Sequence, residues 1–221
     1  MARPQSDLSS RILVAARERF LREGVDGASL RQIAKDAGTN IGMVYYYYPT
    51  KDDLFAAVVE NVYEKLLMDV VERLAPDVPP EQRILRLYLR VASASDDEFA
   101  VVRLILREAM VSSHRLSHIA QRFQRGHLPF VLATLLDGVE GKRFTDRHPP
   151  LLLLTSSVAL ALLPQLIRRL AVEGELPIAS ALPDAESLAR RLHDVLLHGI
   201  AGPALEGDEG RKADPSGTLP P

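Results

Sequence analysis

Cysteine is absent from the 221-residue chain. Its absence excludes a disulfide framework, a thiolate zinc site and a cysteine nucleophile, and it agrees with a reducing cytoplasm. Apolar and polar residues that alternate between hairpin turns, the pattern of half-buried strands, are also scarce. The chain is therefore expected to fold from helices alone.

A leader and a membrane span are not evident either. The N-terminal sequence MARPQSDLSS has no apolar run behind Arg3, which argues against a secretory signal. The most apolar stretch, residues 151–167, is interrupted by Thr155, Pro164 and Gln165. A membrane helix needs about 20 consecutive, mostly apolar residues, so a buried helix is favoured over a span. We expect a cytoplasmic, nucleoid-associated protein.

The usual catalytic motifs are missing. We find no Gly-rich phosphate loop, GxSxG elbow, HExxH pair or convincingly spaced carboxylates, so the sequence predicts neither an enzyme nor a cofactor. His114 and His118 have the spacing of metal ligands on a helix, but no third ligand is identifiable and no metal site is predicted. Arg103 and Arg107, spaced alike, fit either an anion site or a solvated face.

The chain has the composition of a globular protein, and its charge is distributed unevenly along the sequence. Hydrophobic residues make up 47% and charged residues 25%, with a formal net charge of -2. Residues 1–51 hold eight Lys or Arg against five Asp or Glu, so this segment carries +3 and the remainder -5. A basic end on an acidic body is suited to binding a polyanion with one face.

Helical spacing and capping signals predict where the helices begin and end. The first starts at Ser6 or Asp7 and closes at Gly24, and a capping box at residues 29–32 opens the second, which runs to Gly38. Asn40 caps a third helix that ends in tyrosines before Pro49, and residues 50–53 cap a long helix that ends near Pro76. Further helices are predicted at about 81–94, 97–112, 115–138, 149–172 and 184–200, and a disordered tail at 202–221.

The second and third helices form a pair joined by a glycine-containing turn. Such a pair is either a helix-turn-helix, whose second helix enters the DNA major groove, or an ordinary helical hairpin. The run SLRQIAKDAGTNIGMVYYYYPTKDDLF at residues 29–55 resembles the DNA-binding signature of the TetR family of bacterial repressors. The matching elements are Ile33 with Ala34, Ala37 with Gly38, the stretch 42–45, Tyr48, and Lys51 with Leu54.

This resemblance implies an all-α protein with three parts. Residues 1–51 would form a three-helix helix-turn-helix domain, 52–201 a larger helical bundle for ligand binding and dimerisation, and 202–221 the tail. The implied DNA-facing residues are Ser29, Arg31, Asn40, Ile41, Gly42, Met43, Tyr45, Tyr46, Tyr47 and Lys51.

Arg31 and the tyrosines are the most informative of these residues. Arg31 alone can read a guanine edge bidentately, although a phosphate contact is the alternative. Successive helical residues point about 100° apart, so the four tyrosines cannot all touch DNA. Tyr48 stands where the family usually has Phe, so the resemblance implies a core position for it. We expect Tyr46 and Tyr47 at phosphates or base edges, and Tyr45 in either place.

One short recognition helix makes too few contacts for selective binding, so a homodimer on two half-sites of double-stranded DNA is expected. In the family the last two helices form the dimer interface; burial within one chain is the alternative. A stripe of the last helix ends at Gly199. The predicted interface residues are Leu160, Leu163, Ile167, Leu188, Leu192, Val195 and Leu196.

The resemblance also implies a small-molecule pocket between residues 55 and 180. The candidate lining residues, each also compatible with a core or surface place, are Tyr63, Leu67, Tyr88, Leu104, Arg107, Glu108, Met110, His118, Phe123 and His127. The function implied is a sequence-specific regulator, foremost a repressor that an effector releases from a palindromic operator. Activation, corepressor dependence and an interaction protein without DNA binding remain open.

Overall fold

The structure is a computed structural model that describes residues 7–174 and 176–198, and these residues contain helices and no strand. The predicted tail and Gly199 lie outside the described residues. The helices are α1 (Asp7–Gly27), α2 (Leu30–Asp36), α3 (Ile41–Tyr47), α4 (Lys51–Arg73), α5 (Pro80–Ala92), α6 (Asp96–Val111), α7 (Ser113–Gln124), α8 (Leu128–Glu140), α9 (Pro150–Glu173), the 3₁₀ helix η1 (Pro177–Ala181) and α10 (Ala185–His198). The predicted all-α fold is confirmed.

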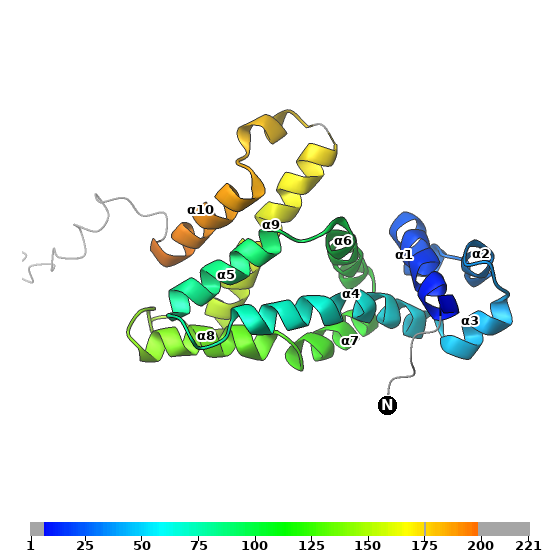
Figure 1. Ribbon diagram of the computed structural model, residues 1–221, viewed down its shortest axis with the longest axis horizontal. Helices are drawn as coiled ribbons and strands as arrows, with labels where there is room; N and C mark the ends of the chain where they lie inside the picture. The colour runs from blue at the N-terminus through cyan, green and yellow to red at the C-terminus, as the bar shows by residue number, and fades with distance from the viewer. Residues whose placement is uncertain (1–6, 175, 199–221) are drawn as a thin grey trace, which may run out of the picture.

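The three N-terminal helices form one end of the molecule, which we call the head (Figure 1). Helix α4 runs from the head into the remaining helices, which we call the body (Figure 1). Within the body, α6 lies next to α1 of the head (Figure 1). Helices α9 and α10 pack on each other and on α5 at the far side of the body.

The core of the head continues into the body. Phe20 of α1 is fully buried and meets Phe55 of α4 edge to face, with 6.3 Å between ring centroids. Val101 and Leu104 of α6 belong to the same buried cluster. Because apolar burial is roughly proportional to the area removed from water, this shared cluster stabilises head and body together.

Two of the predicted helix caps form and one does not. The Asn40 side chain accepts a hydrogen bond from the Met43 N–H at 3.1 Å, and Thr50 and Asp53 form a complete capping box. Ser29 makes no side-chain cap, so the capping box predicted at residues 29–32 is wrong. Since Ser29 is exposed, water can satisfy the first N–H groups of α2.

The single helix predicted over 115–138 is also wrong, because the structure has two helices there, α7 and α8. The turn between them contains buried Gly126, where an added Cβ would lie 2.0 Å from the Tyr63 hydroxyl oxygen. Pro129 then occupies the first turn of α8, where a missing N–H costs nothing. Gly126 and Pro129 are therefore local signals of the break, although the apolar periodicity runs across it.

Helix α9 is long and apolar enough to cross a membrane by length and composition. Its polar residues favour the alternative. Ser157 is fully buried, and the buried Gln165 amide donates to the Ala185 carbonyl at 2.7 Å. These polar positions face neighbouring helices, as expected for a helix that packs in a bundle.

Candidate nucleic-acid interface

Helix α3, the second helix of the predicted helix-turn-helix, is fixed on the head by its two ends and one buried side chain. Gly38 adopts φ +65, the left-handed conformation that the turn after α2 requires, and Asn40 caps the first turn of α3. Val44 is fully buried, and after the helix the Tyr48 hydroxyl lies 2.9 Å from the Ser9 hydroxyl on α1. Helix α3 therefore presents one face to the core and the other to solvent.

All ten predicted DNA-facing residues are at least partly exposed. Ser29, Arg31, Asn40, Gly42, Tyr45 and Tyr46 are exposed, and Ile41, Met43, Tyr47 and Lys51 are half-buried. Tyr45 and Tyr46 expose 49% and 60% of their surface although both are large aromatic residues. Aromatic side chains with polar tips on a short exposed helix are available to a nucleic acid.

The tyrosine run divides as helical geometry requires. Tyr48 packs against the core of the head, as predicted, and burial raises the pKa of its hydroxyl. Tyr47 packs against the same cluster, with its ring between those of Tyr46 and Tyr48, 5.3 and 6.2 Å away by centroid. Tyr45 and Tyr46 are thus more open to a DNA partner than Tyr47.

The head behaves as one unit because charged side chains join its helices. The Arg19 Nε of α1 donates to Asp36 of α2 at 2.7 Å, which lowers the pKa of Asp36, and Arg11 donates to the Ala37 carbonyl at 3.0 Å. The Lys51 ammonium donates to the Asp26 carbonyl at 2.8 Å. Lys51 was predicted to lie near phosphates; in the structure it holds the start of α4 to the end of α1.

The comparisons with known proteins agree with this geometry. Residues 12–58 match the model of the bacterial regulatory proteins of the tetR family. The HTH-type transcriptional repressor SCO4008 of Streptomyces coelicolor is 30% identical over 198 residues, which cover 87% of this chain and 98% of the relative. The chain belongs to the TetR family. It is a DNA-binding transcriptional regulator with an N-terminal helix-turn-helix.

Other regulators resemble the chain over most of its length. A regulator encoded in the dhlA 5' region of Xanthobacter autotrophicus is 26% identical over 204 residues, which cover 87% of this chain and 90% of the relative. The structure of FadR from Bacillus subtilis in complex with stearoyl-CoA has a TM-score of 0.69 and 17% identity, and covers 87% of this chain and 99% of that one. FadR from Bacillus halodurans has a TM-score of 0.66, 17% identity and coverages of 90% and 98%.

Three of the candidate pocket residues come together between α4, α7 and α8. The His127 backbone N–H donates to the Tyr63 hydroxyl at 3.0 Å, and this hydroxyl lies 2.7 Å from His127 Nδ1. Phe123 packs on both rings. Burial and the nearby Arg122 charge lower the pKa of His127 to about 4, so the imidazole is neutral. Its Nδ1 therefore accepts a hydrogen bond from the Tyr63 hydroxyl.

The other candidate pocket residues lie elsewhere. Tyr88 is buried in the body, and this burial raises its pKa to about 12. Its hydroxyl donates to the Ser157 carbonyl at 3.0 Å. Leu104 and Glu108 are buried where α6 meets the head, whereas Met110 is 84% exposed. Of the remaining candidates, Leu67 is half-buried and His118 is exposed. Arg107 donates to the Leu21 carbonyl at 3.3 Å. The ten residues therefore do not line one cavity.

The histidine pair has its predicted proximity. The rings of His114 and His118 lie 4.6 Å apart, both exposed, and His114 Nδ1 is 3.8 Å from Asp52. Among the described residues no group of three ligands capable of holding a metal ion occurs.

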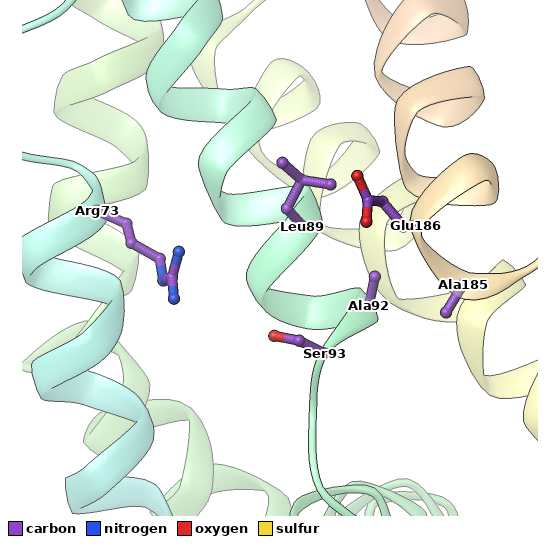
Figure 2. Close-up of a pocket in the computed structure, with 6 residues that line it drawn as sticks. All are labelled: Arg73, Leu89, Ala92, Ser93, Ala185 and Glu186. Carbon is purple, nitrogen blue, oxygen red and sulfur yellow. The ribbon is translucent and has the colours of Figure 1, made fainter.

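A cavity that the sequence did not indicate lies between α4, α5 and α10 (Figure 2). Its volume is ≈ 360 Å³, and its lining residues are Arg73, Leu89, Ala92, Ser93, Ala185 and Glu186. A smaller recess of ≈ 170 Å³ separates α1 from α6 and is lined by Leu21, Arg103, Leu104 and Arg107. The larger cavity depends on how distant helices pack, which leaves no local signal in the sequence. The recess contains the predicted pocket residues Leu104 and Arg107, and also Arg103, the partner of Arg107 in the candidate anion site.

The predicted dimer residues divide into two groups. Leu163 and Ile167 of α9 are 50% and 52% exposed in the single chain. Leu188 is buried inside the chain, and Leu160, Leu192 and Leu196 pack against its core, with Val195 half-buried. Leu152 and Leu170, which the sequence analysis did not single out, extend the exposed apolar face of α9.

Proposed function

We propose that the protein is a homodimeric repressor that holds a palindromic operator with two recognition helices until a small-molecule effector binds. The observation that carries this proposal is the exposed face of α3, with Tyr45 and Tyr46 beside the exposed Arg31 of α2, on a head joined internally by ion pairs. Two such heads are suited to successive turns of a duplex, about 34 to 36 Å apart or further.

Base recognition would rest mainly on Arg31. Its guanidinium can donate to two acceptors of one guanine, a contact worth about 1 to 3 kcal/mol of discrimination. Ile41 and Met43 offer apolar contact to thymine methyl groups, and Tyr46 can donate to phosphates or base edges. Since few side chains read bases directly, DNA shape would contribute the remaining specificity.

The exposed apolar face of α9 supports the homodimer. Leu152, Leu163, Ile167 and Leu170 share one face of α9 and leave large apolar surfaces in water in the single chain. A two-fold axis would pack this face against its own copy, which removes the apolar area from both chains. The functional division into residues 1–51 for DNA and 52–201 for ligand and dimer is part of the same proposal.

The effector pocket is proposed at the cluster of Tyr63, Phe123 and His127. Aromatic walls with a neutral imidazole suit an apolar or amphipathic ligand. Its Nε2–H is the donor that remains once Nδ1 accepts from Tyr63. The similar structure of FadR holds stearoyl-CoA, so acyl-CoA thioesters belong in the first effector screen.

The experiment is a selection of bound fragments from random and genomic DNA, followed by titration of the best fragment at several salt concentrations. We expect a palindromic site whose affinity falls steeply with salt, because phosphate contacts release counterions. Arg31→Ala should relax the selected sequence, while Arg22→Ala, at an exposed arginine of α1, should not. If no sequence outcompetes random DNA with or without candidate ligands, the proposal fails and the interaction-protein alternative gains.

A further inference from the structure

Arg115, in the first turn of α7, is surrounded by three carboxylates from three other helices. Its Nε donates to Asp52 of α4 at 2.9 Å, one Nη donates to Glu108 of α6 at 2.6 Å, and the other donates to Asp26 of α1. The Arg115 side chain is 9% exposed. All three nitrogens of the guanidinium are therefore used, and we call these four residues the hub.

Glu108 ties the hub to the backbone of the head. Its side chain is 3% exposed, and the carboxylate oxygen not paired with Arg115 accepts from the Val25 N–H at 3.1 Å. Helix α1 is interrupted just before this point by Gly24, with φ +76, which frees the Val25 N–H from regular helical bonding. The break in α1 and the buried carboxylate thus fit each other.

A second contact holds α4 and α7 together further along both helices. Arg122 donates to both oxygens of Glu60, each at 2.6 Å, and its guanidinium lies 4.7 Å from the Tyr63 ring centroid. Asp52 and Glu60 are two turns apart on α4, as Arg115 and Arg122 are on α7. The two helices therefore run in the same direction, with the hub at the end near the head and the aromatic cluster at the other.

The electrostatics favour one arrangement of the hub. Hydrogen bonds from Arg115 hold the pKa of Asp26 below its usual range, and Asp26 and Asp52 raise the pKa of Arg115. A buried ion pair adds little net stability against an apolar replacement, but a partner left alone inside the protein is costly. Loss of the contact between Arg115 and Glu108 would leave the buried Glu108 without its cationic partner. The geometry of the hub is therefore strongly restricted.

We propose that Arg115 is the positioning residue that fixes the orientation of the head relative to the body, so that a displacement of α7 at the aromatic cluster reaches the recognition helix. Because Arg19 and Tyr48 join the helices of the head to one another, movement of Asp26 at the end of α1 moves α3 as well. This inference rests on the proposed function, since orientation matters only if two heads must match an operator.

The test removes the contacts that Arg115 makes with Asp26 of α1 and Asp52 of α4. It leaves the buried pair of Arg115 and Glu108 intact. Asp26 and Asp52 are 69% and 47% exposed in their side chains, so the double variant D26N/D52N should fold. The charge-matched control is D7N/E18Q, at two exposed acids of α1. A second variant, E108Q/R115Q, replaces the buried ion pair with neutral hydrogen-bonding side chains.

Orientation is measured by spin labels on cysteines introduced at Arg22 of α1 and Gln121 of α7, both exposed, in a chain without other cysteines. Labelled protein is mixed with excess unlabelled protein so that each dimer carries one labelled chain. We expect a single narrow distance distribution in the parent and control proteins. Both hub variants should give a broader distribution, because the head then samples several orientations.

Affinity for the selected operator is the second readout. If the share of dimers with both heads in the competent orientation falls to about a tenth, operator affinity falls about tenfold relative to the control, while affinity for random DNA does not change. An unchanged distance distribution, or an operator affinity within twofold of the control, would overturn the proposal. Should the parent protein prefer no DNA sequence, the proposed function fails, and the distance measurement alone still decides whether Arg115 positions the head.

Discussion

The recognition helix of the head and the outer face of α9 both expose large side chains, but of different chemistry. Tyr45 and Tyr46 on α3 combine an aromatic ring with a hydroxyl, whereas Leu163 and Ile167 on α9 are purely aliphatic. An aromatic ring with a hydroxyl group makes favourable contacts with a hydrated, charged partner such as DNA. Aliphatic side chains are stabilised only when another apolar surface covers them. The difference indicates one face for nucleic acid and one for a second copy of the chain.

The largest expected effect comes from placing charge on the aliphatic face. L163D/I167D should convert the dimer to a monomer, since two carboxylates per chain would be buried against their own copies. Operator affinity should fall by at least about a hundredfold, because one recognition helix then binds without its partner. Analytical ultracentrifugation and operator titration measure both quantities.

The matched control is Met110→Asp, at an 84% exposed apolar residue of α6. It should leave both the sedimentation coefficient and the operator affinity as in the parent protein. A dimer that survives L163D/I167D would show that exposed aliphatic residues on α9 do not mark the interface.

A smaller effect is expected on the pH dependence of stability, through His127 of the body. Its folded pKa of about 4 lies below the unfolded value of about 6.5, so the unfolded chain binds more protons between these pH values. Stability should therefore fall as pH decreases from 6.5 to 4, with about 1 to 3 kcal/mol attributable to this residue. Urea unfolding of His127→Gln should show a weaker pH dependence over that window, and exposed His148→Gln should behave like the parent.

The smallest expected effects distinguish two tyrosines within the head. Tyr48→Phe removes the hydrogen bond to Ser9 and should lower the free energy of unfolding by about 0.5 to 1.5 kcal/mol. Tyr46→Phe should weaken operator binding a few-fold, through a lost hydroxyl contact with DNA. Urea denaturation and operator titration of both variants measure these effects, and a reversed pattern would exchange the roles of the two residues.

The sequence predicted the head well because its signals are local. Asn40 and the TKDD box lie within a few residues of the groups they cap, and the core position of Tyr48 follows from the family signature, which usually has Phe there. The capping box at Ser29 does not form, although Asn40 and Thr50, which are also exposed, both cap their helices. The DNA-facing residues were transferred from a family signature of fixed spacing, which the exposed positions on α2 and α3 accommodate.

The body was harder to predict because its features join residues far apart in the chain. The hub brings together Asp26, Asp52, Glu108 and Arg115, and no periodicity links these positions. The α7–α8 break has a local signal, Gly126 followed by Pro129, but the close approach of Tyr63 to Gly126 comes from another helix. Candidate pocket residues chosen by type therefore scattered between the core, the surface and one real cluster.

Hydroxyl-radical footprinting of the selected operator with the parent protein tests the central claim most directly. Two matching protected segments, related by the dyad of the palindrome and lost together in L163D/I167D, are the result that two α3 helices on one dimer predict. A single protected segment, or two segments that persist in L163D/I167D, would contradict recognition by a symmetric pair of heads.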